Sequence, residues 1–166
     1  NSASSNCPVT NVTHPQETRM SESQDQRAAN KRAAQRIFDV WDGESLDALD
    51  DVMAEDVVLH GPEQVRGTVQ GRDAYKDNLR MIRAGIPDLF FEANEIVAED
   101  DTVMAYCTFG GTHDGELLGI EPTGTSLEVG WFGSYRFDEG KVVEVIGQPD
   151  LFGVFLQLGV VDPPGG

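Results

Sequence analysis

The 166-residue chain is poor in cysteine, lysine and histidine, and it has no long hydrophobic run. Its two cysteines cannot form a disulfide framework, and no cysteine–histidine spacing resembles a zinc site. Cys107 alternates with apolar residues in VMAYCTF, which is typical of a small core residue. No stretch approaches the ~20 apolar residues that a membrane-spanning helix needs. The first residues lack the basic start and apolar core of a signal peptide, so we expect a cytoplasmic protein.

Basic residues are also scarce: 12 Lys and Arg stand against 29 Asp and Glu, and the net charge is −17. Such a charge repels nucleic acid and anionic membrane, so we exclude both as partners. Only three of the basic residues are lysines. An acidic, lysine-poor surface suits a protein kept soluble in concentrated salt, where long-range repulsion is screened. A halophilic source is therefore one hypothesis, and an ordinary acidic cytoplasmic protein is the other.

What the chain does contain is sufficient for one domain, since 39% of its residues are hydrophobic and 25% are charged. Residues 1–21 begin with a Ser-, Thr-, Asn- and Pro-rich stretch without periodicity. We interpret them as a disordered leader or an artificial extension. We place a single domain at 22–160 and a flexible tail at 161–166.

The spacing of apolar residues predicts helices first and strands afterwards. Three- and four-residue spacing predicts helices at 22–42 and 72–84, and Ser45 is a suitable N-cap for a short helix between them. The terminal LFGVFLQLGV predicts one more short helix. The expected strands are 57–60, 89–98, 102–113, 125–138 and 141–149.

This order indicates an α+β fold with an antiparallel sheet. A long, twisted sheet with helices on one side tends to curl into a cone, and its concave face then encloses a pocket. The strand at 125–138 alternates clearly between two faces. One face carries Leu127, Val129, Trp131, Tyr135 and Phe137, and the other carries Glu128, Gly130, Phe132, Ser134 and Arg136.

The order of elements resembles that of the SnoaL-like polyketide cyclases, which belong to the NTF2-like (nuclear transport factor 2-like) superfamily. The motifs that carry the resemblance are GTHDG…GIEPTG, DEGKVVEV and an Asp before the terminal apolar segment, and it covers about residues 28–160. It implies an NTF2-like cone and an intramolecular aldol ring closure on an aromatic polyketide ester, without metal or cofactor. The family's catalytic aspartate, which removes an α-proton and later supplies one to the carbonyl oxygen, matches Asp150. The histidine of its GTH motif matches His113.

Asp150 and His113 are thus the candidate catalytic residues, but each also has a structural interpretation. Asp150 is well placed to cap the terminal helix, and as a base it would need apolar surroundings that raise its pKa. His113 has the chemistry to donate to a developing enolate oxygen or to orient Asp150. Alternatively it orders the loop near Thr123, and we favour this role at the mouth of the pocket.

Six further residues are candidates for substrate binding. His60 ends the first strand, in a segment that often faces the pocket in NTF2-like folds. Arg136 either neutralises a substrate carboxylate or Asp150, or forms a surface ion pair of little value. The cyclases tend to carry histidine or glutamine on the strand that here holds Ser134 and Arg136. The full set is His60, Trp41, Trp131, Phe132, Ser134 and Arg136.

Three functions remain open. The first is a cofactor-independent cyclase or isomerase that enolises a small hydrophobic carbonyl or ester substrate. The second is a non-catalytic protein that holds a small hydrophobic or aromatic ligand. The third is an epoxide or ester hydrolase of the same fold. We also expect a homodimer through the convex face of the sheet, because a monomer would expose a large apolar patch there.

Overall fold

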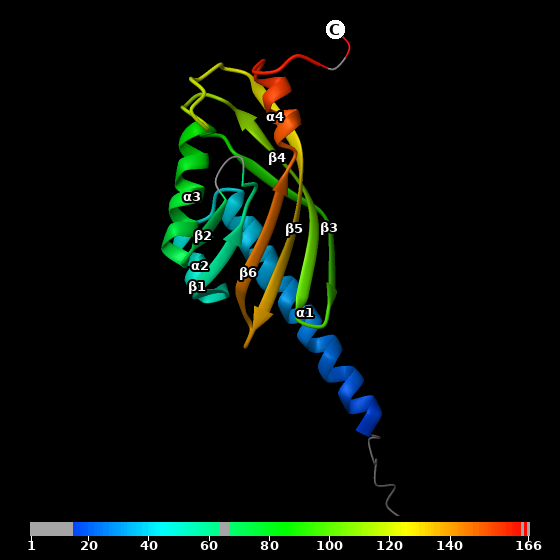
Figure 1. The fold of residues 1–166 in the computed structure, drawn as a ribbon. Coiled ribbons are helices and arrows are strands. Elements are labelled where there is room, and N and C mark those ends of the chain that lie inside the picture. The colour runs from blue at the N-terminus through cyan, green and yellow to red at the C-terminus, as the bar shows by residue number, and fades with distance from the viewer. Residues whose placement is uncertain (1–14, 64–66, 164, 166) are drawn as a thin grey trace, which may run out of the picture.

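The computed structural model describes residues 15–63, 67–163 and 165, with four helices packed against one curved sheet (Figure 1). The helices are α1 (Pro15–Trp41), α2 (Leu49–Val52), α3 (Arg72–Gly85) and α4 (Leu151–Gln157), and a 3-10 turn, Leu46–Ala48, precedes α2. The strands are β1 (Met53–His60), β2 (Thr68–Gln70), β3 (Phe90–Glu99), β4 (Thr102–Thr112), β5 (Ser126–Asp138) and β6 (Lys141–Pro149).

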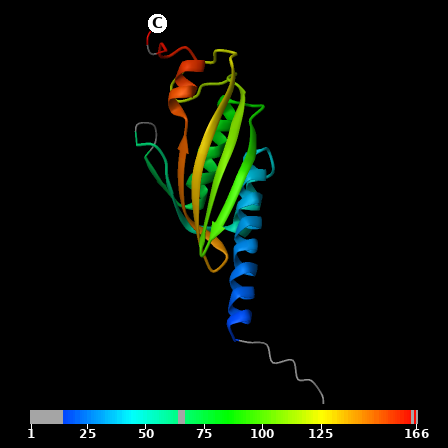
Figure 2. The same ribbon diagram turned by 90° about the vertical axis from the view of Figure 1, so that its right-hand side faces the viewer.

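The six strands form one sheet in the order β2-β1-β6-β5-β4-β3. Helices α1 and α3 lie on its concave side, and no helix of the described chain covers the opposite, outward side of the central strands (Figure 2). The predicted α+β cone is therefore confirmed. The sheet is mixed rather than antiparallel, because β1 runs parallel to β6, with His60 opposite Ile146. This pairing arises because the chain leaves β1, builds the rest of the sheet as a meander, and returns beside β1 only at its end.

The helix boundaries differ from the predicted ones at the N-terminus. Helix α1 begins at Pro15, seven residues before the predicted start, because its first two turns are polar and carry no apolar periodicity. The leader expected at residues 1–21 lies largely outside the described residues. At its other end, α1 is tied to α3 by Arg83, which donates to the backbone oxygens of Val40 and Glu44. The predicted N-cap Ser45 is confirmed, since its hydroxyl accepts from the Asp47 N–H.

The core lies between α1 and the concave face of the sheet. Phe38 of α1 packs against Phe91 and Tyr135, with ring centroids 5.7 and 5.5 Å apart. The alternation predicted for β5 is confirmed, because Leu127, Val129, Tyr135 and Phe137 are all buried. Cys107 is fully buried, and burial raises the pKa of its thiol to about 12, so it is a neutral core residue.

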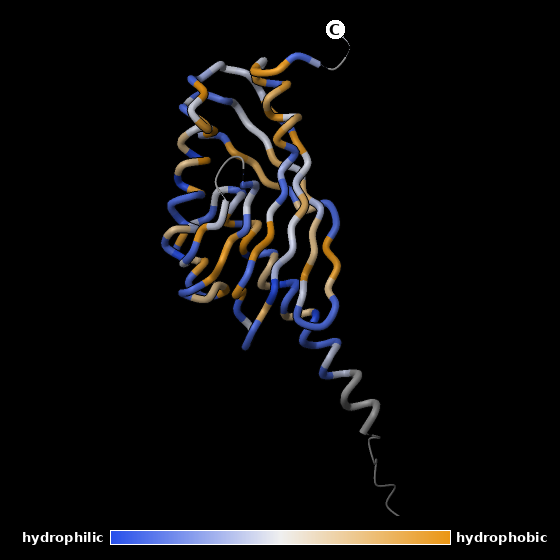
Figure 3. The backbone as a smooth tube through the Cα atoms, in the orientation of Figure 1, coloured by the Kyte–Doolittle hydropathy of each residue, from blue (hydrophilic) through white to orange (hydrophobic). Residues whose placement is uncertain are grey.

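Hydrophobic and hydrophilic residues both occur along the strands (Figure 3), and some of the hydrophobic ones are exposed on the outward face of the sheet. Its exposed large side chains are Val97, Met104, Tyr106, Phe132 and Ile146. The rings of Tyr106 and Phe132 stack on each other with centroids 4.7 Å apart. None of the helices in the described part of the chain is long and apolar enough to cross a membrane.

Asp88 joins the start of β3 to the end of β4. Its two carboxylate oxygens accept from the Thr112 backbone N–H at 2.5 Å and from the Thr112 hydroxyl at 2.8 Å. These bonds, the backbone one first, hold the pKa of Asp88 below its ordinary value of 3.8. Because the pKa is lower in the folded than in the unfolded state, this contribution to stability is present above the unfolded pKa. It is lost as the pH falls through the folded pKa.

We therefore expect Asp88→Asn to lower the free energy of unfolding at pH 7 and to make it fall less steeply below pH 4. Urea unfolding at a series of pH values between 7 and 2.5 measures both effects. Asp114→Asn removes one exposed carboxylate nearby and controls for the loss of charge. Equal pH profiles for the wild type and Asp88→Asn would contradict the expectation.

Candidate functional site

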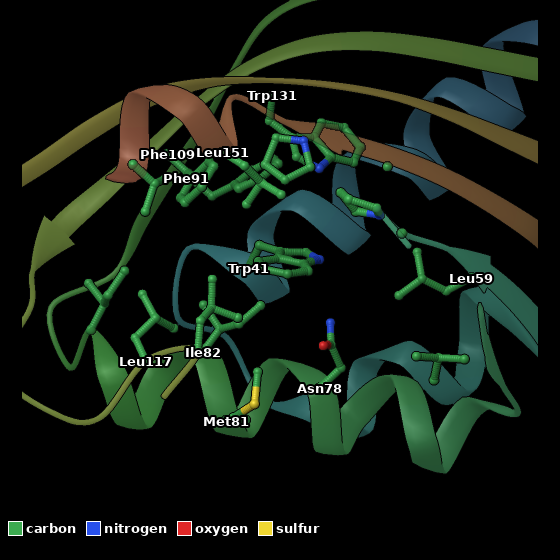
Figure 4. Close-up of a pocket in the computed structure, with 18 of the residues that line it drawn as sticks. Trp41, Leu59, Asn78, Met81, Ile82, Phe91, Phe109, Leu117, Trp131 and Leu151 are labelled. Atoms are coloured by element: carbon green, nitrogen blue, oxygen red, sulfur yellow. The ribbon is translucent and has the colours of Figure 1, made fainter. Parts of the chain in front are cut away.

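A cavity of about 150 Å³ lies between the concave face of the sheet and α3. Figure 4 shows side chains from several elements directed into it. Trp41 enters from the end of α1, Ile82 from α3, Trp131 from β5 and Leu151 from the start of α4. The pocket that the fold class predicted is therefore present, and residues far apart in the sequence build it.

The described residues that line this cavity are mainly apolar. Among the described lining residues there is no Asp, Glu, His, Lys or Arg, and the side chains with nitrogen or oxygen are Trp41, Tyr75, Asn78 and Trp131. Trp41 Nε1 donates to the Tyr75 hydroxyl at 2.8 Å. Burial raises the pKa of Tyr75 to about 12 against the opposite effect of this bond, so the phenol stays neutral. The cavity therefore suits a neutral, apolar ligand.

Two glycines hold the indole of Trp131 in place. Gly133 and Gly147 are paired across β5 and β6. A Cβ atom on Gly133 would overlap the Trp131 ring, and one on Gly147 would lie 3.2 Å from its Nε1. The ring therefore lies over the backbone of both glycines, and its other side contacts Phe91, with centroids 5.6 Å apart. This arrangement makes Trp131 part of the floor of the cavity.

Residues 113–125, here called the strap, close another side of the cavity with Leu117 and Leu118. The strap docks on the end of α3, where the N–H groups of Asp114 and Gly115 both donate to the Gly85 oxygen. Gly115 must be glycine there, since a Cβ atom would overlap the Ala84 carbonyl. The strap is therefore fixed by backbone contacts at close approach.

His113 holds the two ends of the strap together. It is fully buried, its backbone N–H donates to the Thr125 oxygen at 2.9 Å, and its backbone oxygen accepts from Gly124 at 2.9 Å. Its ring Nδ1 accepts from the Thr123 N–H at 3.3 Å and lies 3.0 Å from the Thr123 hydroxyl. His113 is not among the cavity-lining residues. These contacts are those of a residue that orders the mouth of the pocket.

Asp150 lies at the rim of the cavity, with its carboxylate turned away from it. Its neighbours Pro149 and Leu151 line the cavity, whereas Asp150 itself does not. The side chain is exposed and caps α4, with Oδ1 accepting from the Gly153 N–H at 2.8 Å. No hydrogen bond within the described residues joins Asp150 to His113. The structure thus places the two candidate catalytic residues in separate structural roles.

Of the six candidate substrate-binding residues, Trp41 and Trp131 line the cavity. The other four, His60, Phe132, Ser134 and Arg136, lie on the outward face, because side chains alternate along each strand. There, Arg136 and His60 bind the two oxygens of Glu144 at 2.9 and 3.0 Å. These bonds, that of Arg136 first, hold the pKa of Glu144 below its ordinary value. A ligand in the cavity does not reach this ion cluster.

Sequence reasoning missed Asn78 as a site residue. Asn78 lies on the face of α3 that carries Tyr75, Leu79 and Ile82 toward the interior. A polar residue among inward-facing apolar ones was therefore the available signal. The Tyr75 hydroxyl, on the same face, accepts from the indole N–H of the cavity-lining Trp41.

A second, more open depression of about 440 Å³ lies between α1 and β3. It contains Asp39, Asp42 and Glu92, but Asp42 is engaged in the fold, since its carboxylate accepts from the Phe91 N–H at 2.9 Å. Within the described residues, no group of three or more His, Cys, Asp or Glu side chains could hold a metal ion.

The family model of the SnoaL-like polyketide cyclases matches residues 31–158. The chain belongs to this family. No match was found among curated proteins.

Solved structures share the SnoaL-like fold over most of their length. AclR, a candidate hydroxylase from Streptomyces galilaeus, is 27% identical with a TM-score of 0.72, over 84% of this chain and 87% of that one. A candidate SnoaL-like polyketide cyclase from Jannaschia sp. CCS1 is 21% identical with a TM-score of 0.75, over 82% and 95%. An LEH-like epoxide hydrolase of M. tuberculosis is 15% identical with a TM-score of 0.64, over 81% and 92%. These three proteins are named for three different activities, so the shared fold alone does not assign an activity to this chain.

Proposed function

We propose that this SnoaL-like protein binds a small hydrophobic ligand in the cavity between α3 and the sheet. The observation that carries the proposal is the cavity itself, which is open at the rim, walled by apolar side chains, and faced by Trp41 and Trp131. Apolar walls with a few neutral polar groups are the usual composition of small-molecule sites. Transfer of an apolar ligand from water into this space is favourable because its surface is removed from water.

The chain itself supplies the reporters for a binding experiment. It contains two tryptophans, and both line the cavity. We expect hydrophobic ring compounds to shift both indole N–H signals in ¹H–¹⁵N spectra in a saturable way. In Ile82→Phe, where a larger side chain fills part of the cavity, the affinity should fall. Absence of any saturable shift, or equal affinity in Ile82→Phe, would argue against the proposal.

A second candidate function is acid–base catalysis of the cyclase or isomerase type, with Asp150 as the base. Family membership favours it, as does the place of Asp150 between two cavity-lining residues. To act on a bound ligand, the carboxylate has to leave the Gly153 N–H and turn toward the cavity. There it would face apolar walls, which keep bulk water away from a reacting carboxylate. An epoxide or ester hydrolase would use the same carboxylate to activate a water molecule.

Replacement of Asp150 separates its two possible roles. Serine is a good N-cap but no base, and alanine is neither. We expect Asp150→Ala to lower the free energy of unfolding by about 1 kcal/mol and Asp150→Ser to leave it nearly unchanged. If Asp150 is the base, both variants lose turnover of an enolisable ketone. Full turnover in both variants would exclude the catalytic role, and equal stability of Ala and wild type would exclude the cap.

We also propose a homodimer through the outward face of the sheet. The stacked Tyr106 and Phe132 lie at its centre, and the nearby carboxylate of Glu144 is bonded to both Arg136 and His60. Glu95 and Glu128 also face outward, at the edges of this surface, so the contact between two copies would centre on the apolar rings rather than extend over the whole face. A second copy would cover the apolar side chains that no helix covers.

Light scattering tests the dimer. We expect the wild type to have twice the chain mass at micromolar concentration and Phe132→Glu to be monomeric. Phe152→Glu is the matched control, since Phe152 is similarly exposed, at 52% against 60%, but lies on α4. A monomeric wild type, or a dimer that Phe132→Glu leaves intact, would contradict the proposal.

A further inference from the structure

We propose that the cavity takes a compact, uncharged, single-ring compound with one carbonyl oxygen, which Asn78 recognises. This inference rests on the proposed binding function and names the ligand class of the same site. It follows from three properties of the cavity: its size, the absence of ionised side chains among its described lining residues, and the position of one amide.

The size of the cavity limits the number of rings. An engineered protein cavity of about 150 Å³, lined by leucine, isoleucine and phenylalanine, binds benzene. The cavity here has the same volume, about 150 Å³, and a similar apolar lining. By this comparison, the cavity has room for one six-membered ring with a short substituent. A compound of three fused rings would extend beyond the walls.

The composition of the walls limits the charge of the ligand. The described lining residues include no ionised side chain, and Tyr75 stays neutral because burial raises its pKa to about 12. An anion or cation in this space would lose its hydration without gaining a counter-charge, which is costly. A neutral ring, in contrast, can pack against the indole faces of Trp41 and Trp131.

Asn78 supplies the polar recognition. It lies on α3 with only 7% of its surface exposed, and Figure 4 shows its amide directed from the helix toward Trp41 across the cavity. The indole N–H of Trp41 is already used by Tyr75. An asparagine amide has two N–H donors and an oxygen that accepts two bonds, so it can bond a ligand carbonyl in addition to a protein partner. A ligand with one carbonyl uses this group, whereas a plain hydrocarbon does not.

Four probes of defined chemistry test the inference, with the two indole N–H signals as the readout. Acetophenone is the single-ring ketone, α-methylstyrene is its planar hydrocarbon counterpart, benzoate is the anion, and anthraquinone has three rings. We expect acetophenone to bind at least tenfold more tightly than benzoate and more tightly than anthraquinone. Asn78→Leu should weaken acetophenone about tenfold, as the loss of one hydrogen bond does, and leave α-methylstyrene within twofold. Arg80→Leu, a change at an exposed position of the same helix that does not line the cavity, should alter neither.

The outcomes separate this inference from the proposed function. Tighter binding of anthraquinone, equal binding of benzoate, or an unchanged acetophenone affinity in Asn78→Leu would overturn the inference and leave hydrophobic binding intact. If no probe shifts either indole signal, the proposed function itself fails. If Asn78→Leu does not fold, the affinities of the four probes for the wild type still test the predicted size and charge of the ligand.

Discussion

Gly133→Ala is expected to lower the free energy of unfolding by about 1 to 3 kcal/mol and to abolish ligand binding in the cavity. The reason is that the new methyl group would occupy the space of the Trp131 indole, which lies over the Gly133 backbone. The ring must then rotate away, either into the cavity or against Phe91. Urea unfolding measures the first effect, and the ¹H–¹⁵N signals of the two indoles measure the second.

Gly130→Ala is the matched control for this change. Gly130 is on the same strand but on the outward face, and a Cβ atom there would meet the Tyr106 ring at 3.4 Å, an ordinary contact. Alanine is also preferred over glycine within a strand by roughly 0.5–1 kcal/mol, so Gly130→Ala should be neutral or slightly stabilising. A Gly133→Ala variant that is as stable as Gly130→Ala and keeps an unshifted Trp131 signal would show that the indole is not held as described.

The alternation of side chains along a strand could be predicted from the sequence. Which of the two faces lines the cavity could not. The pattern at 125–138 correctly places Trp131 on one face and Phe132 on the other. Yet both were chosen as site residues, because a periodic pattern does not say which face holds the cavity. The sequence also did not predict that Gly133 and Gly147 lie under the Trp131 ring, since Gly133 only interrupts the alternating pattern. Their role depends on a contact across β5 and β6 and on one side-chain rotamer.

Pairings that are distant in sequence could not be predicted either. The strand around His60 was identified, but its parallel partner around Ile146 lies 86 residues later, and no local motif links the two. The orientation of Asp150 is a similar case. The same residue in the same place is compatible with a cap and with a base, and only the hydrogen bond to Gly153 describes where its carboxylate lies. The halophilic source inferred from composition stays a prediction.

His113→Ala is the second change with a large expected effect, about 3 kcal/mol in the free energy of unfolding. The ring is fully buried, and its removal leaves an internal space and deletes the bonds to Thr123 that hold the strap closed. Because Leu117 and Leu118 of the strap line the cavity, ligand affinity should fall as well. Urea unfolding and hydrogen exchange of the strap amides measure the two consequences.

Thr123→Val distinguishes the ring from its partner. It keeps His113 and the Thr123 backbone N–H and deletes only the hydroxyl, so we expect a loss of about 1 kcal/mol and little change in affinity. If His113 were catalytic, the opposite result would be expected. His113→Ala would then lose turnover, while its free energy of unfolding and the hydrogen exchange of the strap amides would stay unchanged. His113 stands at one end of the strap, bonds residues at the other end and does not line the cavity. We therefore expect the ordering role, with any loss of function following the loss of the closed strap.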